Sequence, residues 1–390
     1  MSIDKPSERE VGPRVHREPE MTASDRPVLI TGGAGFIGAN LADRLLSSGR
    51  EVVVLDNLSR AGVERNVAWL RDRHGGRLSV HVGDIRDPDM VARAVAGVGQ
   101  VFHFAAQVAV TTSLLDPVED FEINAGGTLT LLEAIRGLEE PPALLFTSTN
   151  KVYGALEDIP LQRASSRYVP GDRALRSRGV GEARPLDFHS PYGCSKGTAD
   201  QYVLDHARSF GLRTAVFRMS CIYGPRQFGT EDQGWVAHFL IRTLEGNTIT
   251  LYGDGKQVRD ILYVGDLVDA FLLAERHMDR ISGRAFNIGG GPENTLSLLE
   301  LVDRIAVMHG ERPELALERW RTGDQRYYVS DTSRFTEATG WKPRVSVDEG
   351  LTRLYTWLSD ERAAAPRKRR RVRKQSEVEQ STIAVAEELA

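Results

Sequence analysis

The feature of this sequence that most constrains its fold is an apolar run that leads directly into three evenly spaced glycines. Residues 26–31 read RPVLIT and are followed by GGAGFIG, in which Gly32, Gly35 and Gly38 lie three positions apart. The run predicts a buried strand, and GFIGANLADRLLSSG (35–49) predicts a helix. Gly32 permits a tight turn, Gly35 lets backbone approach a pyrophosphate, and Gly38 lets the helix pack close to the strand. This order of elements predicts dinucleotide binding at the helix N-terminus.

Four more short apolar runs follow the first, with helical stretches such as 120–137 between them. They are EVVVLD (51–56), LSVHVG (78–83), QVFHFA (100–105) and ALLFTS (143–148). Strict alternation of strands and helices predicts an α/β fold with a doubly wound parallel sheet of the Rossmann type. From about residue 225 the alternation stops. We therefore expect a dinucleotide-binding domain over 25–224 and, mainly over 225–361, a smaller C-terminal lobe that binds the substrate.

The composition is that of a globular protein rather than a fibrous or membrane protein. The chain has 390 residues, of which 41% are hydrophobic and 27% charged, so it can bury a large core. Its two cysteines, Cys194 and Cys221, offer neither a disulfide framework nor a metal-binding spacing, so we expect no metal and a reducing compartment. No apolar run approaches the roughly 20 residues that span a bilayer, and the polar N-terminus has no secretory signal. These features predict a cytoplasmic enzyme without a membrane partner.

The formal charge of -4 conceals a strongly basic segment near the C-terminus. PRKRRRVRK (366–374) has no acidic residue among its arginines and lysines. Such a run could bind nucleic acid or an anionic surface. We favour a solvated tail, so no nucleic-acid partner is expected, and we predict disorder for residues 1–24 and 362–390.

The choice of dinucleotide is predicted from the end of the second strand. A carboxylate at Asp56 can accept hydrogen bonds from the ribose hydroxyls and repels a 2′-phosphate, which favours NAD over NADP. Arg60 could instead meet such a phosphate, so NADP remains an alternative. After the third strand, Asp84 and Ile85 are placed to meet the adenine, although Asp84 could be a simple turn or cap residue.

A candidate catalytic pair lies beyond the fifth strand, in SPYGCSK. Tyr192 and Lys196 are at i and i+4, hence on one helix face. A lysine one turn away and a cationic nicotinamide would lower the pKa of the phenol toward neutral, so Tyr192 is the predicted general base. Thr149, at the end of the fifth strand, is the third predicted member and would donate a hydrogen bond to the reacting oxygen. It could also simply cap the strand end.

These features, with the glycine spacing GxxGxxG, resemble the extended short-chain dehydrogenase/reductase family of nucleotide-sugar enzymes over about residues 25–360. STNKVYG, LDFHSPYGCSKGTADQY, YGPRQFGTEDQGWV, GDGKQVRD and FNIGGGPENTLSLLEL are similar to the branch that epimerises C2 of CDP-linked hexoses. One position differs from the family at large, since Cys221, preceded by Ser220, stands where an asparagine is common. The resemblance implies an NAD-dependent isomerase that acts on a CDP-sugar in carbohydrate metabolism, and a homodimer or homotetramer.

The residues after Thr149 bear on the type of reaction. In the 4,6-dehydratases of this family they are typically Asp and Glu, which expel water as an acid–base pair; here they are Asn150 and Lys151. Asparagine cannot ionise, and lysine is a cation unless its pKa is strongly lowered. The site is therefore expected to invert C2 through a transient 2-keto sugar without eliminating water. Lys151 could instead turn outward as a solvated charge.

The resemblance also assigns binding residues, among which arginines suit a diphosphate because of their fork of donors. Arg259 and Arg326 are the expected diphosphate contacts, Arg226 is a further candidate, and Arg321 could exchange roles with Arg326. Three residues of FNIGGG are expected to shape a turn beneath the site: Asn287, Gly289 and Gly290. The expected cofactor contacts are Gly32, Gly35, Phe36, Ile37, Gly38, Asp56, Asn57, Ser59, Arg60, Asp84, Ile85, Ala105, Gln107, Thr147, Tyr192 and Lys196. The expected substrate contacts are Gln107, Thr149, Asn150, Arg226, Arg259 and Arg326.

Two other functions stay open at this point. One is an epimerase or other oxidoreductase of the same family that acts on another carbon or nucleotide, such as an NDP-sugar 4-epimerase, which a substrate panel would separate. The other is a non-enzymatic NAD-binding sensor or scaffold that uses the basic tail. The intact Thr149, Tyr192 and Lys196 argue against the second.

Overall fold

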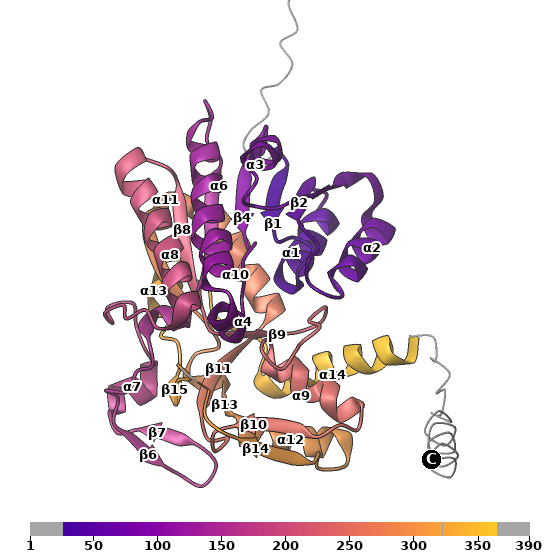
Figure 1. Ribbon diagram of the computed structural model, residues 1–390, viewed down its shortest axis with the longest axis vertical. Coiled ribbons are helices and arrows are strands. Elements are labelled where there is room, and N and C mark those ends of the chain that lie inside the picture. Colours follow the sequence, from indigo (N-terminus) through magenta and orange to yellow (C-terminus); the bar gives the residue numbers. More distant parts are fainter. Residues whose placement is uncertain (1–25, 322, 365–390) are drawn as a thin grey trace, which may run out of the picture.

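The computed structural model describes residues 26–321 and 323–364. Its largest sheet has seven parallel strands in the order β12-β8-β5-β4-β1-β2-β3 (Figure 1). The strands are β1 (Val28–Thr31), β2 (Val52–Asp56), β3 (Leu78–Val82), β4 (Gln100–His103), β5 (Ala143–Thr149), β8 (Thr214–Met219) and β12 (Arg284–Ile288). The predicted doubly wound parallel sheet is thus confirmed, and the five strands predicted from apolar runs agree within two residues at each end.

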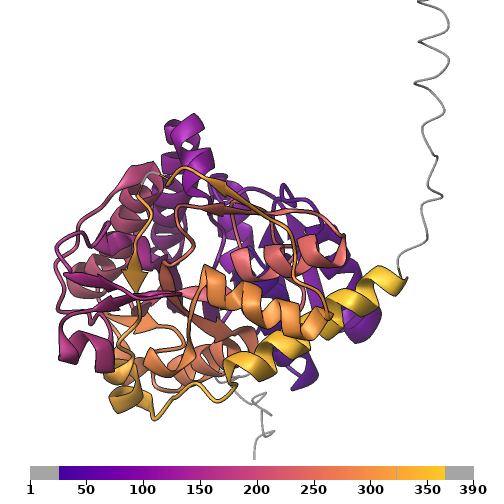
Figure 2. The same ribbon diagram turned by 90° about the horizontal axis from the view of Figure 1, so that it is seen from below.

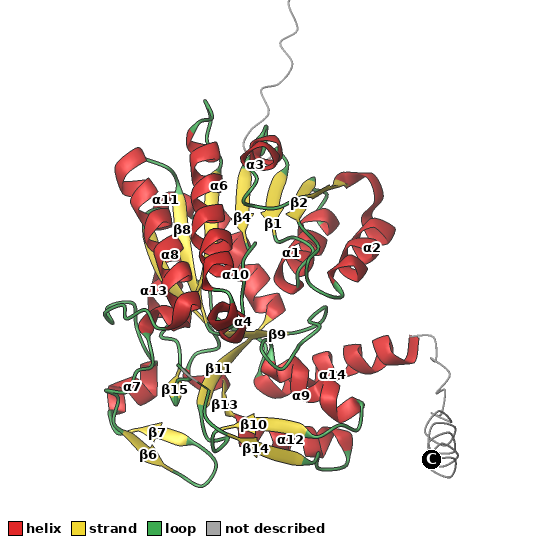
Figure 3. Ribbon diagram, in the orientation of Figure 1, coloured by secondary structure: helices red, strands yellow, loops and turns green. Residues whose placement is uncertain are grey.

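Helices cover both faces of this sheet (Figure 3), because successive strand residues point to opposite sides. Val28 and Ile30 contribute to the core on one face, whereas Leu29 contributes to the core on the other. The first face carries α1 (Phe36–Ser47), α2 (Val63–His74), α10 (Val264–Arg276), α11 (Met278–Ile281) and α13 (Ser333–Thr339). The second face carries α3 (Pro88–Val95), α6 (Gly127–Arg136) and α8 (Ser190–Phe210).

A smaller lobe with its own apolar core lies below the carboxyl ends of the strands in Figure 1, where its elements are coloured salmon to yellow, and Figure 2 shows it from below. Its strands are β9 (Cys221–Tyr223), β10 (Ile249–Tyr252), β11 (Val258–Tyr263), β13 (Thr295–Ser297), β14 (Leu315–Glu318) and β15 (Tyr327–Tyr328). Its helices are α9 (Trp235–Leu244), α12 (Leu298–His309) and α14 (Val347–Ala364). A hairpin of β6 (Leu161–Arg163) and β7 (Tyr168–Pro170), followed by α7 (Arg173–Arg178), extends the lobe.

The chain crosses between the large sheet and the smaller lobe several times, whereas the predicted boundary after residue 224 implies a single crossing. The strand β12 follows the first strands of the lobe in sequence, yet it pairs with β8, which satisfies the backbone groups at that edge of the large sheet. Conversely, β7 precedes residue 225 but lies against the lobe, where Tyr168 N donates to Lys256 O at 3.0 Å. The segment 225–361 is therefore shared between the two parts.

Short elements connect the large ones and include the segments that form the site. They are α4 (Val110–Leu115), α5 (Pro117–Phe121), the π-helical turn Glu122–Gly126, and the 3₁₀ turns Gly75–Arg77, Asn150–Tyr153 and Pro292–Asn294. The predicted tails 1–24 and 365–390, with the basic run 366–374, lie outside the described residues. Residues 362–364 belong to α14, so the predicted start of the C-terminal tail at 362 is three residues early. Within the described residues, no helix is both long and apolar enough to cross a membrane.

Candidate active site

A cleft of about 670 Å³ lies between the carboxyl ends of the central strands and the smaller lobe. β1 has β4 on one side and β2 on the other, so the strand order reverses here, which is where open α/β sheets bind ligands. Residues of both parts line the cleft. From the large sheet and its helices come Gly32, Thr149, Tyr192 and Lys196, and from the lobe come Trp235, Tyr252 and Arg259.

The glycine turn between β1 and α1 has the close packing that its spacing predicts. Gly32 has φ +68°, and a Cβ on it would lie 2.6 Å from Ala105 N; a Cβ on Gly38 would lie 2.5 Å from Gly32 O. Helix α1 begins after Gly35, and in the described structure no side chain caps it and no acid lies in its first turn. Its first N–H groups can therefore receive an anion. Three more predicted cofactor residues line the same cleft: Phe36, Ile37 and Arg60.

Asp56 ends β2 directly beneath this turn and braces it. Its carboxylate accepts hydrogen bonds from Ala34 N at 3.0 Å and Leu58 N at 2.9 Å. Burial raises the pKa of Asp56, while these backbone donors oppose that rise. The carboxylate thus supports the glycine turn, and its contact with a ribose remains a prediction.

The predicted adenine and ribose residues beyond Asp56 make contacts within the protein. Asp84 accepts from the Arg86 guanidinium at 2.9 Å, which holds the pKa of this carboxyl at about 2, and it also accepts from Asn57 Nδ2 at 3.3 Å. Asp84 therefore does stabilise its own turn, which was the alternative interpretation of this residue. Ile85 is buried in the core, where a Cβ on Gly127 would lie 2.6 Å from it. Ser59 is exposed, its N–H donating to Asn57 Oδ1 at 3.1 Å, and Thr147 lines the cleft.

Gln107 is not among the residues that line the cleft, although its neighbours Ala106 and Val108 are, and its contacts with cofactor and sugar remain a prediction. Its amide folds back on its own loop, where Nε2 donates to Ala109 O at 2.8 Å and Oε1 accepts from Ala109 N. Asn124, in the π-helical turn, fastens this loop by accepting from Gln107 N at 3.0 Å and donating to Ser195 Oγ at 3.0 Å. The sequence analysis missed Asn124, because no periodic pattern marks a π-helical turn.

The structure brings the three predicted catalytic residues together on one wall of the cleft. Thr149, Tyr192 and Lys196 all line it. Burial raises the pKa of Tyr192 to about 12 although the Thr149 hydroxyl opposes that rise, and burial lowers the pKa of Lys196 to about 7. Lys196 Nζ also lies 4.1 Å from the centroid of Phe146. The expected lowering of the Tyr192 pKa by Lys196 is therefore not found in the protein alone, where burial has the largest effect and the Asp120 carboxylate adds to the rise.

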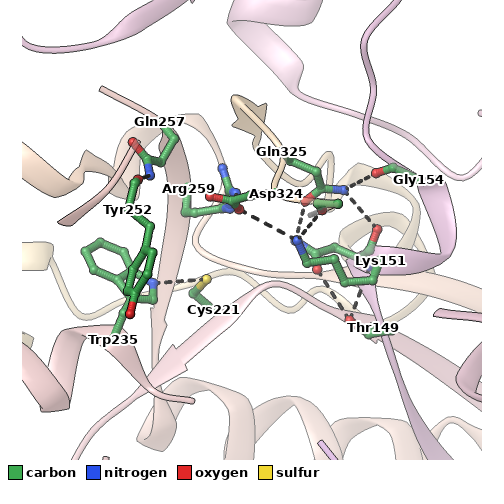
Figure 4. Close-up of polar contacts among 12 residues, drawn as sticks. Thr149, Lys151, Gly154, Cys221, Trp235, Tyr252, Gln257, Arg259, Asp324 and Gln325 are labelled. Atoms are coloured by element: carbon green, nitrogen blue, oxygen red, sulfur yellow. Dashed lines mark hydrogen bonds and ion pairs between the residues drawn. The ribbon is translucent and has the colours of Figure 1, made fainter. Parts of the chain in front are cut away.

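The two unusual residues after Thr149 face the lobe rather than solvent, and Figure 4 shows Lys151 directed at Asp324. Lys151 Nζ donates to Gly323 O at 3.1 Å and lies 3.8 Å from Asp324 Oδ1. Asn150 Nδ2 donates to Gln325 Oε1 at 3.4 Å. Burial lowers the pKa of Lys151, while Asp324 opposes that lowering. The alternative that Lys151 turns outward as a solvated charge is wrong.

Two of the candidate diphosphate arginines line the cleft, and a third does not. Arg259 is nearly buried and donates to Asp324 Oδ1 at 2.7 Å. Arg321 lies 3.8 Å from the Tyr252 ring centroid at the cleft wall. Arg326 is exposed and stacks instead 5.5 Å from the Trp320 ring centroid. Because Arg321 lines the cleft and Arg326 does not, Arg321 is the candidate that the geometry supports.

Arg226 also lies away from the residues that line the cleft, which corrects its predicted substrate contact. Its guanidinium lies 4.0 Å from the ring centroid of Trp69 and 5.6 Å from that of Trp357. It forms an ion pair with Glu361 at 3.7 Å. Cation–π contacts to two tryptophans join α2 to α14, so Arg226 holds these helices together.

Several residues of the lobe that line the cleft were not singled out from the sequence. Trp235 Nε1 donates to Cys221 Sγ at 3.3 Å, and Gln257 Nε2 donates to Tyr252 O at 2.7 Å (Figure 4). Tyr252 and Gln257 belong to the same segment, LYGDGKQVRD, as Arg259, and this proximity could have identified them. Further lobe residues on the cleft wall are Glu231, Asp232, His238, Arg319 and Trp320.

The FNIGGG segment supports the site from beneath, as its glycines predict. Tyr153 OH donates to Asn287 Oδ1 at 2.8 Å. A Cβ on Gly289 would lie 2.1 Å from Asp260 Oδ2, and a Cβ on Gly290 would lie 2.2 Å from Ile261 O. Both positions therefore need glycine for close packing.

Comparison with known proteins gives consistent matches over most of this chain. Residues 28–289 match the NAD dependent epimerase/dehydratase family. CDP-paratose 2-epimerase of Salmonella typhi is 45% identical over 339 residues, which cover 85% of this chain and 99% of that protein. Two crystal structures of UDP-glucose 4-epimerases have similar folds. The Thermotoga maritima enzyme with UDP-glucose has a TM-score of 0.72 and 32% identity, covering 86% of this chain and 99% of that one. The Thermus thermophilus enzyme with NAD has a TM-score of 0.71 and 34% identity, covering 85% and 99%.

Proposed function

Because this chain belongs to the NAD-dependent epimerase/dehydratase family, we propose that it inverts C2 of a CDP-linked hexose or dideoxyhexose of the paratose or tyvelose type. The 45% identity over nearly the whole Salmonella typhi enzyme carries this proposal, since the two UDP-glucose 4-epimerases are 32% and 34% identical. Asn150 and Lys151 support it, because neither can replace the acid–base pair that would eliminate water.

The residues on the cleft wall fit NAD, the cofactor of the family. The turn at Gly32 leaves no room for a side chain, and the uncapped start of α1 offers backbone N–H groups to a pyrophosphate. Gly32, Gly35 and Arg60 would hold the phosphates, and Asp56 would meet the adenosine ribose. When bound, NAD supplies a hydride acceptor and a positive charge that favours the Tyr192 phenolate.

In the proposed reaction, Tyr192 accepts the proton of the C2 hydroxyl as the carbon is oxidised, and Thr149 donates a hydrogen bond to the same oxygen. The 2-keto sugar then rotates within the cleft, so that the other face of C2 meets the cofactor. Tyr192 returns the proton to the oxygen once the carbon has been reduced on its other face. Lys196 stays close to the pair and supplies positive charge when protonated. The cycle has no net redox change, so the cofactor should stay bound through turnover.

Isotope labelling in heavy water tests this mechanism. The hydrogen on C2 should leave and return without exchange, so the product should contain no deuterium at C2, and a substrate deuterated at C2 should keep its label. Proton NMR of the product measures both. Stoichiometric solvent deuterium at C2 would contradict the proposal. Inversion at C4 with a retained label would indicate the 4-epimerase alternative, and no turnover of any CDP- or UDP-sugar by the NAD-loaded chain would favour the sensor or scaffold.

We also propose that the protein forms a homo-oligomer, a dimer or tetramer. Apolar side chains are exposed on the neighbouring helices α5, α6 and α8: Val118 65%, Phe121 54%, Leu129 36%, Tyr202 46% and Phe210 51%. Rows of such side chains on packed helices commonly mark a protein interface. Light scattering should give a multiple of the 43.2 kDa chain mass, and Phe121→Glu should lower it.

A further inference from the structure

Three charged side chains from distant segments meet on the wall of the cleft (Figure 4). Lys151 follows the catalytic strand β5, Arg259 lies on β11 of the lobe, and Asp324 precedes β15. Asp324 Oδ1 accepts from Arg259 at 2.7 Å and lies 3.8 Å from Lys151 Nζ. Their side chains are 8% exposed for Arg259, 22% for Asp324 and 23% for Lys151. We call this cluster the Lys151–Asp324–Arg259 bridge.

Further hydrogen bonds, one from Lys151 itself and the others from side-chain amides, fasten the same two segments beside the bridge. Lys151 Nζ donates to Gly323 O at 3.1 Å, and Gln325 Nε2 donates to Gly154 O at 2.7 Å. Asn150 Nδ2 donates to Gln325 Oε1 at 3.4 Å. Residues 323–325 of the lobe are therefore held against the turn that follows Thr149.

Each end of the bridge reaches a functional group. At one end, Lys151 N donates to Thr149 Oγ1 at 3.2 Å, and Thr149 lines the cleft together with Tyr192. At the other end, Arg259 is oriented by donating to Val258 O at 2.8 Å and to Asp324. A guanidinium has five N–H donors, so donors remain for a diphosphate. Asp324 neutralises one of the two cations and leaves one net positive charge.

The distance between the diphosphate and Tyr192 bears on which ring carbon reacts. In a nucleotide sugar C1 carries the diphosphate, C2 is its neighbour, and C4 lies across the ring. A cation that holds the diphosphate at a fixed distance from the general base therefore places either C2 or C4 beside that base, but not both. Misplacement by about 1 Å can cost about 10²-fold in rate.

We infer that Lys151 and Asp324 are positioning residues that fix Arg259 relative to Thr149 and Tyr192, so that C2 of the bound sugar meets the general base. The inference rests on the proposed function, because it takes a nucleoside diphosphate sugar as substrate. Lys151 does no proton transfer in this role, since its amine is directed at Gly323 O and Asp324. Asp324 gives the bridge its geometry while it opposes the binding of an anion.

The test compares Lys151→Met and Asp324→Asn in the full-length, NAD-loaded protein. In calorimetry with CDP, Lys151→Met removes one positive charge and should weaken binding about tenfold, roughly 1.4 kcal/mol. Asp324→Asn removes the negative charge and should leave CDP binding equal or tighter. With the nucleotide sugar that the wild type epimerises, both variants should lose about 10²-fold in kcat. If the two variants differ in CDP binding in this way but lose kcat equally, the loss of kcat comes from mispositioning. A loss of structure would weaken CDP binding in both variants.

Two more variants sharpen the result. Lys151→Arg should recover most of kcat, because arginine can also pair with Asp324, whereas a proton carrier would not be replaced. Lys151→Met/Asp324→Asn should be no slower than either single variant, since both act through one bridge. Lys256→Met is the matched control, because this lysine likewise donates to a backbone carbonyl, Ala164 O at 2.8 Å, and is not among the residues that line the cleft.

The outcomes separate the inference from the proposed function. Wild-type kcat in Lys151→Met, additive losses in the double variant, or equal weakening of CDP binding by both single variants would overturn the bridge. If the wild type turns over no CDP- or UDP-sugar, the proposed function fails, and opposite shifts in CDP affinity would still support the bridge as the element that orients Arg259.

Discussion

The two walls of the cleft are built in different ways. The wall next to β1 and α1 comes from one continuous stretch, in which Gly32, Gly35 and Gly38 present backbone to a ligand. The opposite wall presents side chains from remote segments, since Lys151 and Gly323 are 172 positions apart in sequence. A ligand bound by backbone groups is excluded when a substitution adds a Cβ that occupies its space. A ligand bound by side chains loses or gains one charged contact with each substitution. The comparison teaches that cofactor use is tied to local geometry, and that substrate choice can be altered by single substitutions.

The largest effect is expected where the two walls meet. Tyr192→Phe keeps the ring and removes the proton carrier, so the rate of epimerisation should fall about 10²- to 10⁴-fold. NAD content should stay at the wild-type level, because the proposed cofactor contacts lie mainly on the wall next to β1 and α1. Steady-state assays and chromatography of released nucleotide measure the two quantities. A variant as fast as the wild type would show that Tyr192 is not the base.

The backbone wall is broken by a single methyl group. In Gly38→Ala the new Cβ would lie 2.5 Å from Gly32 O, and overpacking of this kind costs about 1–3 kcal/mol. NAD affinity should therefore fall about 5- to 150-fold in calorimetry. Gly137→Ala is the control, because its Cβ would meet Glu133 O at an ordinary 3.5 Å and should leave NAD binding unchanged. Equal affinities in the two variants would contradict the assignment of a backbone wall.

The side-chain wall should distinguish two neighbouring arginines. Arg321 lines the cleft and forms ion pairs with Glu231 and Asp232, whereas Arg326 is exposed, stacks on Trp320 and is not among the residues that line the cleft. Arg321→Gln should weaken CDP binding roughly 30-fold, because a hydrogen bond to a charged group contributes about 2 kcal/mol. Arg326→Gln should change it little. The reverse ranking in calorimetry would restore Arg326 as the diphosphate contact.

The smallest expected effect concerns the choice of dinucleotide. Asp56 should favour NAD over NADP at least tenfold, about 1.4 kcal/mol, because its carboxylate would repel the 2′-phosphate. Asp56→Ala should lose most of this preference, and Asp56→Asn separates charge from hydrogen bonding to the glycine turn. Titration of each protein with both dinucleotides measures the ratio. Equal wild-type affinities would show that Arg60 balances the carboxylate.

Local patterns in the sequence predicted the backbone wall well. Apolar runs indicated β1 to β5, and the glycine spacing indicated a turn that the structure contains. The spacing of Tyr192 and Lys196 placed them on one helix face, and both line the cleft. These patterns succeed because strand period, helix period and glycine φ are set within a few residues.

The predictions that the structure does not support concern the surroundings of individual side chains, whether the partner is remote or on the same loop. Arg226 packs between Trp69 and Trp357, and Gln107 folds back on its own loop. Burial raises the pKa of Tyr192 to about 12, and the Asp120 carboxylate adds to that rise. The spacing of residues in the sequence does not indicate which other segments will bury a given side chain.

By itself, the sequence determined the parallel sheet, the glycine turn and the placing of Tyr192 and Lys196 on one helix, because each depends on short-range geometry. Only the tertiary structure decided that Lys151 faces Asp324, that Arg321 rather than Arg326 lines the cleft, and that β12 returns to the large sheet. The physical reason is that burial and charge pairing depend on which distant segments come into contact, and packing of the whole chain selects those contacts.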